Sequence, residues 1–177
     1  MEVQLKKYCW YVIYTRACHE FKAEEYLKAN GIEAFLPKRG EFKQWSDRKK
    51  WVETSLFPSY IFVRVSCKEY AKALQHSSIV RYVAIDGCPC RLPDEQIEAI
   101  KTILQNQLMF EITTEKFEPG DSVVFCEGPL TGYSAEIVNI RGIKEVVLRI
   151  PGTYQSMLIK TNNEFVKKAV PLWPVIV

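Results

Sequence analysis

A basic stretch in the first half of the chain carries the residue types best suited to binding chemistry. Between Lys38 and Lys50, six basic residues stand against Glu41 and Asp47, which leaves a net charge of +4 over thirteen positions. Lysine and arginine contact phosphate oxygens, and tryptophan rings stack on bases. The candidate nucleic-acid-binding residues are Lys38, Arg39, Trp45, Arg48, Lys49, Lys50 and Trp51. The competing interpretation is a solvated hairpin, because charged runs often only keep a loop soluble.

An aromatic turn follows the basic stretch. Phe57, Pro58, Ser59 and Tyr60 lead into Phe62, and in a strand the side chains of Tyr60 and Phe62 would project from the same face. Such a face can serve as a contact patch for another macromolecule. The alternative is that all of these rings fill a core, as aromatic residues in strands commonly do.

The other reactive residue types do not form a recognisable site. Cys88-Pro89-Cys90 is too tight for the usual zinc spacing, and neither histidine stands at finger spacing from a cysteine pair. Cys18 next to His19 is a candidate thiol nucleophile, but catalysis needs a base and an orienting group that meet in space. The sequence has no Gly-rich phosphate loop, His-Glu-x-x-His or Gly-x-Ser-x-Gly motif. We therefore expect no enzyme, no metal site and no cofactor.

Composition sets the frame for these residues. With 177 residues and 47% apolar content, the chain can form two small domains with real cores. The net charge is only +3, so any basic surface must be local. Six cysteines, without a signal peptide or a run near the roughly 20 apolar residues that span a bilayer, predict a cytoplasmic protein with free thiols and no membrane contact.

The first part of the chain is expected to be an α+β domain that ends near Gln107. The expected elements are a strand at 9–15, a helix at 19–30, strands at 32–42 and 51–65, a helix at 68–75, a strand at 79–85 and a helix that opens at 92–95. Gly31 is placed to end the first helix, and Asp86-Gly87 to form a turn. The two longer strands would form an extended hairpin with the basic residues at its tip.

The second part reads as a small SH3-like barrel preceded by a connector. Residues 108–116 are the expected linker, although they are less polar than a free linker should be. Five short strands are expected at 123–126, 135–140, 146–150, 156–160 and 165–168. The apolar tail at 170–177 either packs on the barrel or contacts a partner.

Two blocks of sequence resemble one known family. Trp10-Tyr11-Val12, Phe35-Leu36-Pro37 and Leu56–Val63 resemble the N-terminal domain of NusG-family transcription elongation factors. The stretch Phe117–Ile150, which contains Pro119-Gly120-Asp121, resembles the KOW motif that follows in that family. The resemblance implies an NGN domain at 1–107, an antiparallel sheet flanked by helices, then a linker at 108–116 and a KOW domain at 117–177 with the apolar tail.

The resemblance also implies a partner and a mechanism. Family members bind RNA polymerase at the β′ clamp helices and reach across the DNA channel toward the β subunit, which opposes the clamp opening that accompanies pausing. By position in the motif, the clamp-binding residues would be Phe57, Pro58, Tyr60 and Phe62, with Tyr14 and Arg16. Specialised members also read the non-template DNA strand, and the basic stretch would serve that purpose or bind nascent RNA.

The run Gln44–Trp51 is most similar to the UpxY-like antiterminators of capsular polysaccharide loci. A housekeeping NusG-type factor is the first alternative, although Ser59 stands where such forms usually carry glycine. An RNA-binding, ribosome-associated KOW protein is the second, but such proteins lack the N-terminal block. In the family the KOW domain recruits Rho, ribosomal protein S10 or another factor, and the sequence does not decide among them.

Overall fold

The computed structural model describes residues 7–44, 48–115, 120–140, 143–160 and 166–168. Its internal contacts divide the chain into two units, one of residues 1–94 with 151–153 and the other of residues 95–150 with 154–177. Each unit is described by itself. Two sequence expectations, Trp45 as a stacking residue and the apolar tail at 170–177, lie outside the described residues.

The first unit is built on an antiparallel sheet around β1 (Cys9–Thr15). This strand pairs with β5 (Tyr60–Val65) on one side and with β6 (Ile79–Tyr82) on the other. The short strands β2 (Glu33–Phe35) and β9 (Arg91–Leu92) pair with β5 and β1. Residues 10–13 are all buried, so the expectation of a central strand covered on both faces is confirmed.

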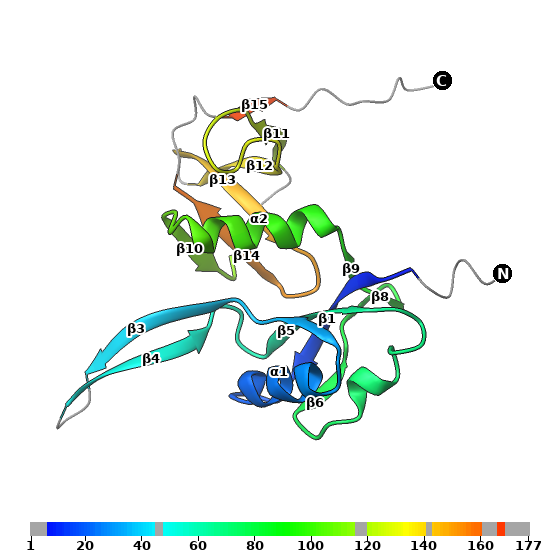
Figure 1. Cartoon of the computed structure of the whole chain (residues 1–177). Helices are drawn as coiled ribbons and strands as arrows, with labels where there is room; N and C mark the ends of the chain where they lie inside the picture. The colour runs from blue at the N-terminus through cyan, green and yellow to red at the C-terminus, as the bar shows by residue number, and fades with distance from the viewer. Residues whose placement is uncertain (1–6, 45–47, 116–119, 141–142, 161–165, 169–177) are drawn as a thin grey trace, which may run out of the picture. The chain divides into compact units, whose positions relative to one another are not determined.

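Helix α1 (Glu20–Ala29) lies along this sheet (Figure 1). Its fully buried Ala23 and Leu27 belong to the same hydrophobic cluster as Ile13 and Ile61 of the sheet. The chain turns at Gly31, whose φ of 72° is a left-handed conformation that glycine adopts without strain. The alternation in β1 and the apolar spacing in α1 therefore predict one shared core correctly.

The helix expected at 68–75 is much shorter in the structure. Only η2 (Lys72–Leu74), a single 3₁₀ turn, forms there. Ser66 begins a separate turn in which its backbone N–H and hydroxyl both donate to the Glu69 carboxylate, each at 3.0 Å. A segment this short cannot offset the cost of starting an α-helix, so local hydrogen bonds decide its conformation.

The expected hairpin is confirmed, but it forms a sheet of its own. Strands β3 (Lys38–Gln44) and β4 (Lys49–Ser55) pair antiparallel along their full lengths and extend outward as a two-stranded ribbon (Figure 1). The longer strands expected at 32–42 and 51–65 are each interrupted. Pro37 lacks a ladder donor, and Ser59 takes a left-handed φ of 66°, so both interruptions have a backbone cause.

A second, smaller hairpin follows β6. Strands β7 (Ala84–Ile85) and β8 (Cys88–Pro89) pair across Asp86 and Gly87, whose φ angles are 50° and 78°. Positive φ at both central residues is what a two-residue hairpin turn requires, and an Asp-Gly pair supplies it. The turn expected at these two residues is confirmed.

The second unit contains α2 (Asp94–Gln105) from Glu95 onward and one antiparallel sheet in the order β10-β14-β13-β12-β11-β15. The strands are β10 (Phe110–Thr113), β11 (Asp121–Phe125), β12 (Ser134–Ile140), β13 (Ile143–Ile150), β14 (Gln155–Ile159) and β15 (Val166–Lys168). Five of them match the short strands expected from the sequence. The SH3-like KOW barrel is not confirmed, because the strand pairing among the described residues gives one sheet with β10 and β15 as its outermost strands.

The stretch expected as a linker is partly structured. Residues 110–113 pair with β14 in the register Phe110↔Ile159 and Ile112↔Met157. Phe110 and Ile112 are half-buried, which explains why the stretch is more apolar than a linker. The contacts also group residues 95–107 with the second unit, whereas we expected the first domain to continue to Gln107. The Gln96 side chain donates to the backbone carbonyl of Arg149 within that unit.

Candidate functional site

Two half-buried tyrosines and their neighbours form the first candidate surface. Tyr14 and Tyr60 are cross-strand partners in β1 and β5, and their rings meet edge to face at 5.5 Å. Arg16 follows the end of β1 and Pro58 precedes β5, and both are exposed. We call Tyr14, Arg16, Pro58 and Tyr60 the tyrosine surface. It combines aromatic rings with a cation, a composition typical of protein-binding surfaces.

The two phenylalanines predicted to share this surface lie in the core. Phe57 and Phe62 are both 0% exposed, and their rings pack edge to face at 5.9 Å. Phe35, the cross-strand partner of Phe62 in β2, also packs against it, at 6.2 Å between ring centroids. Tyr60 and Phe62 do project from the same face of β5. That face is half-buried at Tyr60 and fully buried two residues later, at Phe62. In this structure the phenylalanines support the tyrosine surface and present no atoms to a partner.

A buried carboxylate fixes the turn beneath the tyrosine surface. The backbone N–H of Ser59 donates to Glu20 Oε1 at 2.6 Å, and the N–H of Thr15 donates to the Ser59 carbonyl at 2.8 Å. Glu20 is 5% exposed and stands in the first turn of α1, where a negative charge is favoured. Sequence reasoning did not single out Glu20. The feature that could have identified it is an acidic residue at the start of a helix whose N-terminus has no side-chain cap.

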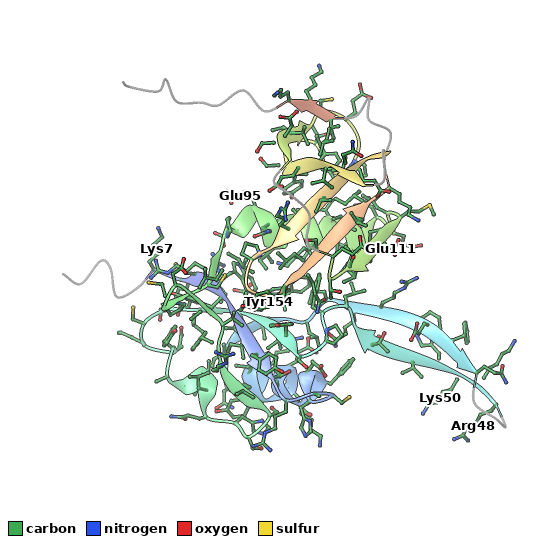
Figure 2. All side chains as sticks on the ribbon, turned by 180° about the vertical axis from the view of Figure 1, so that it is seen from behind. Lys7, Arg48, Lys50, Glu95, Glu111 and Tyr154 are labelled. Atoms are coloured by element: carbon green, nitrogen blue, oxygen red, sulfur yellow. The ribbon has the colours of Figure 1, made fainter. Side chains whose placement is uncertain are left out.

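The basic hairpin is the second candidate surface, and its register divides the residues between two faces. Opposed residues share a face, so Phe42 and Trp51 lie on one face, with Lys49 two positions along. Arg39 and Lys50 lie on the other face. Both are exposed, as are Lys49 and Arg48, and Figure 2 shows Arg48 and Lys50 pointing outward near the free end of the ribbon.

Lys38 differs from the other basic candidates because its charge is already engaged. Its Nζ lies 2.7 Å from Glu24 Oε2 and 5.0 Å from the centroid of the Phe21 ring. Lys28 contacts the same carboxylate, at 2.7 Å from Oε1. Lys38 therefore attaches the start of β3 to α1. Among the described hairpin residues, the exposed cations that remain for phosphate contact are Arg39, Arg48, Lys49 and Lys50.

The Glu24 carboxylate makes a testable contribution to stability. Burial alone would raise its pKa, but the hydrogen bonds and charges of Lys28 and Lys38 outweigh burial, so the pKa lies below the ordinary 4.5. A group with a lowered folded-state pKa stabilises the protein above its unfolded-state pKa and loses that contribution as pH falls through the folded-state value. We expect Glu24→Gln to be less stable than wild type at neutral pH.

The stability difference between Glu24→Gln and wild type should shrink as pH falls below about 4.5. Urea unfolding midpoints measured from neutral to acidic pH would check this. Glu25→Gln is the matched control, because Glu25 is the exposed neighbour in the same helix and should leave the profile unchanged. A constant difference between Glu24→Gln and wild type at every pH would contradict the assignment.

The candidate thiol and metal chemistry finds little support in the geometry. His19 Nδ1 lies 2.9 Å from the Ala17 carbonyl oxygen, so that nitrogen faces the backbone. Within the described ranges, no three His, Cys, Asp or Glu side chains are grouped closely enough to hold a metal ion. No helix in the described part of the chain is both long and apolar enough to cross a membrane.

An antiparallel α+β unit that carries a basic hairpin and a half-buried tyrosine pair, followed by a second, largely β unit, defines a two-part protein with two candidate surfaces for binding macromolecules. Comparison with known families makes this class specific. The model of the family described as "NusG: Transcription termination factor nusG" matches residues 8–101, more than half of the chain. The chain therefore belongs to the NusG family. Its members are transcription factors and not enzymes, which agrees with the expectation from the sequence.

One solved structure has a similar fold. The structure titled "Domain interaction in Thermotoga maritima NusG" has 23% sequence identity and a TM-score of 0.50, and the match covers 92% of this chain and 97% of that chain. Two conformations of an MjSpt4:Spt5 complex match at 15% and 16% identity. The matches cover 90% of this chain and 97% and 95% of the matched chains, and both TM-scores are 0.29, too low to show a shared overall fold.

Proposed function

We propose that this protein is a transcription elongation and antitermination factor that binds RNA polymerase at the β′ clamp helices. The tyrosine surface is the observation that carries the proposal. Tyr14, Arg16, Pro58 and Tyr60 all fall within the residues that the NusG family model matches, and the Glu20–Ser59 hydrogen bond fixes the turn beside them. Aromatic side chains on a pre-organised backbone bind a partner with little ordering cost.

In the proposed mechanism the protein bridges the DNA channel from the clamp helices toward the β subunit. A protein that binds the closed clamp better than the open clamp shifts the equilibrium by its differential affinity alone. About 1.4 kcal/mol of that difference changes the ratio tenfold and would suppress pausing. The basic hairpin would contact the non-template strand or nascent RNA, with Arg39, Arg48, Lys49 and Lys50 on phosphates and Trp51 on a base.

The proposed specialisation is service at particular operons, those of capsular polysaccharide loci. The resemblance of the run 44–51 to UpxY-like antiterminators supports it. We further propose an NGN domain at 1–107, a linker at 108–116 and a KOW domain at 117–177. The KOW domain would recruit ribosomal protein S10 or another factor.

The alternative function is that of a housekeeping NusG-type factor, because the description of the matched family names a transcription termination factor. In vitro transcription across a Rho-dependent terminator separates the two. An antiterminator should raise read-through when Rho is present, whereas a housekeeping factor should lower it.

The test of polymerase binding is a double substitution, Tyr14→Ala with Tyr60→Ala. We expect it to weaken binding to purified RNA polymerase elongation complexes by at least about tenfold, because it removes both rings of the tyrosine surface. Tyr154→Ala is the control, since Tyr154 is an exposed tyrosine in the second unit. Circular dichroism checks folding. Unchanged affinity in the folded double variant would reject this surface, and no wild-type binding would reject the proposed function.

A further inference from the structure

The hairpin carries an exposed aromatic pair that the proposed polymerase contact does not use. Phe42 is 72% exposed and Trp51 is 55% exposed, although both are large apolar residues. They are directly opposed in the β3–β4 register, and their rings meet at 4.7 Å and 70°. Two aromatic residues that are this exposed on one ribbon indicate a surface that another molecule covers when it binds.

Gly40 explains how the indole ring is held. A Cβ atom at Gly40 would lie 2.0 Å from Trp51 Cζ2, 2.7 Å from Cε2 and 2.9 Å from Cη2. Gly40 is not among the glycines with positive φ, so its backbone conformation does not call for glycine. The Trp51 indole ring instead packs directly against the Gly40 backbone, in the space that a side chain at position 40 would occupy. We call Gly40, Phe42 and Trp51 the aromatic platform.

Charge is distributed unevenly around the aromatic platform. Lys49 lies on the same face, two positions from Trp51 toward the free end of the ribbon. Glu53 lies two positions from Trp51 in the other direction, opposite Gly40, and is exposed. A polyanion on this face would therefore place its phosphates on the Lys49 side. Arg48, Lys49 and Lys50 in succession favour a polyanion over an apolar peptide as the ligand.

We propose that the aromatic platform stacks an unpaired nucleobase while Lys49 contacts the adjoining phosphate, so that the hairpin selects single-stranded nucleic acid over duplex. Every base has a π face, so stacking needs no particular sequence, but bases inside a duplex are already stacked on each other. Because Gly40 positions the indole ring in advance, the side chains lose little further conformational entropy when the base binds. This inference rests on the nucleic-acid contact in the proposed function and specifies the ligand.

The test compares the full-length protein and its variants by fluorescence anisotropy with a labelled single-stranded DNA, its RNA equivalent and the DNA duplex. We expect Trp51→Val and Phe42→Val each to weaken single-strand binding by roughly tenfold. Valine keeps the strand preference without a ring. Duplex binding and the slope of log Kd against log salt should not change. Lys49→Gln should instead lower that slope by about 0.7 on a single strand, because one phosphate contact is lost.

Gly40→Ala tests the platform without removing a ring or a charge. The new methyl group must displace the Trp51 indole, so we expect a loss of single-strand affinity close to that of Trp51→Val. Glu53→Gln should strengthen binding a few-fold, because it removes the charge of the wrong sign from this face. Backbone amide chemical shifts of Glu41 and Val52 would show whether the hairpin register survives in each variant.

The outcomes separate this inference from the proposed function. If Trp51→Val, Phe42→Val and Gly40→Ala bind single strands as wild type does while Lys49→Gln binds weakly, the platform is wrong and the phosphate contact stands. Equal losses on single strands and duplex would also overturn the platform. If wild type binds none of the three nucleic acids but binds elongation complexes, both the platform and the hairpin contact fail and polymerase binding stands.

Discussion

Phe62→Ala is expected to lower the free energy of unfolding by about 3–5 kcal/mol, the usual cost of removing a fully buried phenylalanine ring. Phe62 is 0% exposed and contacts the rings of Phe57 and Phe35, so the deletion leaves a cavity next to both aromatic neighbours. Urea denaturation followed by circular dichroism would measure the loss. Tyr60→Ala, two residues earlier on the same face of β5, should cost only about 1 kcal/mol, chiefly through its ring contact with Tyr14.

The contrast between these two variants separates core from contact surface. If Phe62→Ala abolishes polymerase binding, the loss would follow from unfolding, whereas a loss in Tyr60→Ala would occur in a folded protein. Phe42→Ala is a further control, because Phe42 is exposed and should change global stability little. Equal destabilisation by Phe62→Ala and Tyr60→Ala would contradict the burial that the structure assigns.

Local patterns predicted much of the first unit. The alternation in 9–15 identified a strand buried on both faces, and the spacing of Ala23 and Leu27 identified the buried stripe of α1. Asp86-Gly87 formed the expected turn because these residues accept positive φ. Each of these features depends on residues close together in the sequence, so the sequence alone contains the physical cause.

Features that depend on distant residues could not be predicted in this way. Period-two alternation places Tyr60 and Phe62 on one face, but it does not say where along the strand the cover begins. Lys38 counts as a free cation until α1 brings Glu24 within 2.7 Å of it. Residues 110–113 form a strand because they pair with the edge of β14, and nothing in their own sequence indicates that pairing.

The candidate site was predicted in composition more than in arrangement. The basic stretch and the aromatic turn were both recognised, and the hairpin register then separated Arg39 and Lys50 from Trp51. Phe42 was not predicted as a site residue from the sequence, because an aromatic residue in a strand is usually buried. Only the exposure of its ring and its contact with Trp51 make it a candidate.

Glu20→Ala is expected to cost about 2 kcal/mol of stability, because it leaves the Ser59 amide without its acceptor in a partly buried turn. Ser59 holds a φ of 66°, a conformation that a non-glycine residue adopts only when its surroundings enforce it. Urea denaturation would measure the loss. Glu20→Gln keeps an oxygen at the amide and should cost less, and Glu25→Ala, at an exposed position of the same helix, should cost little.

A second substitution shows whether Glu20 acts through the turn or through its charge at the helix start. Glycine adopts a positive φ without strain, so adding Ser59→Gly to Glu20→Ala should recover about 1 kcal/mol if the carboxylate serves to hold Ser59 in its left-handed conformation. If Glu20 acts only through the helix dipole, Ser59→Gly would change Glu20→Ala and wild type by the same amount. Recovery confined to Glu20→Ala, with restored affinity for elongation complexes, would tie the alignment of Tyr14 and Tyr60 to this hydrogen bond.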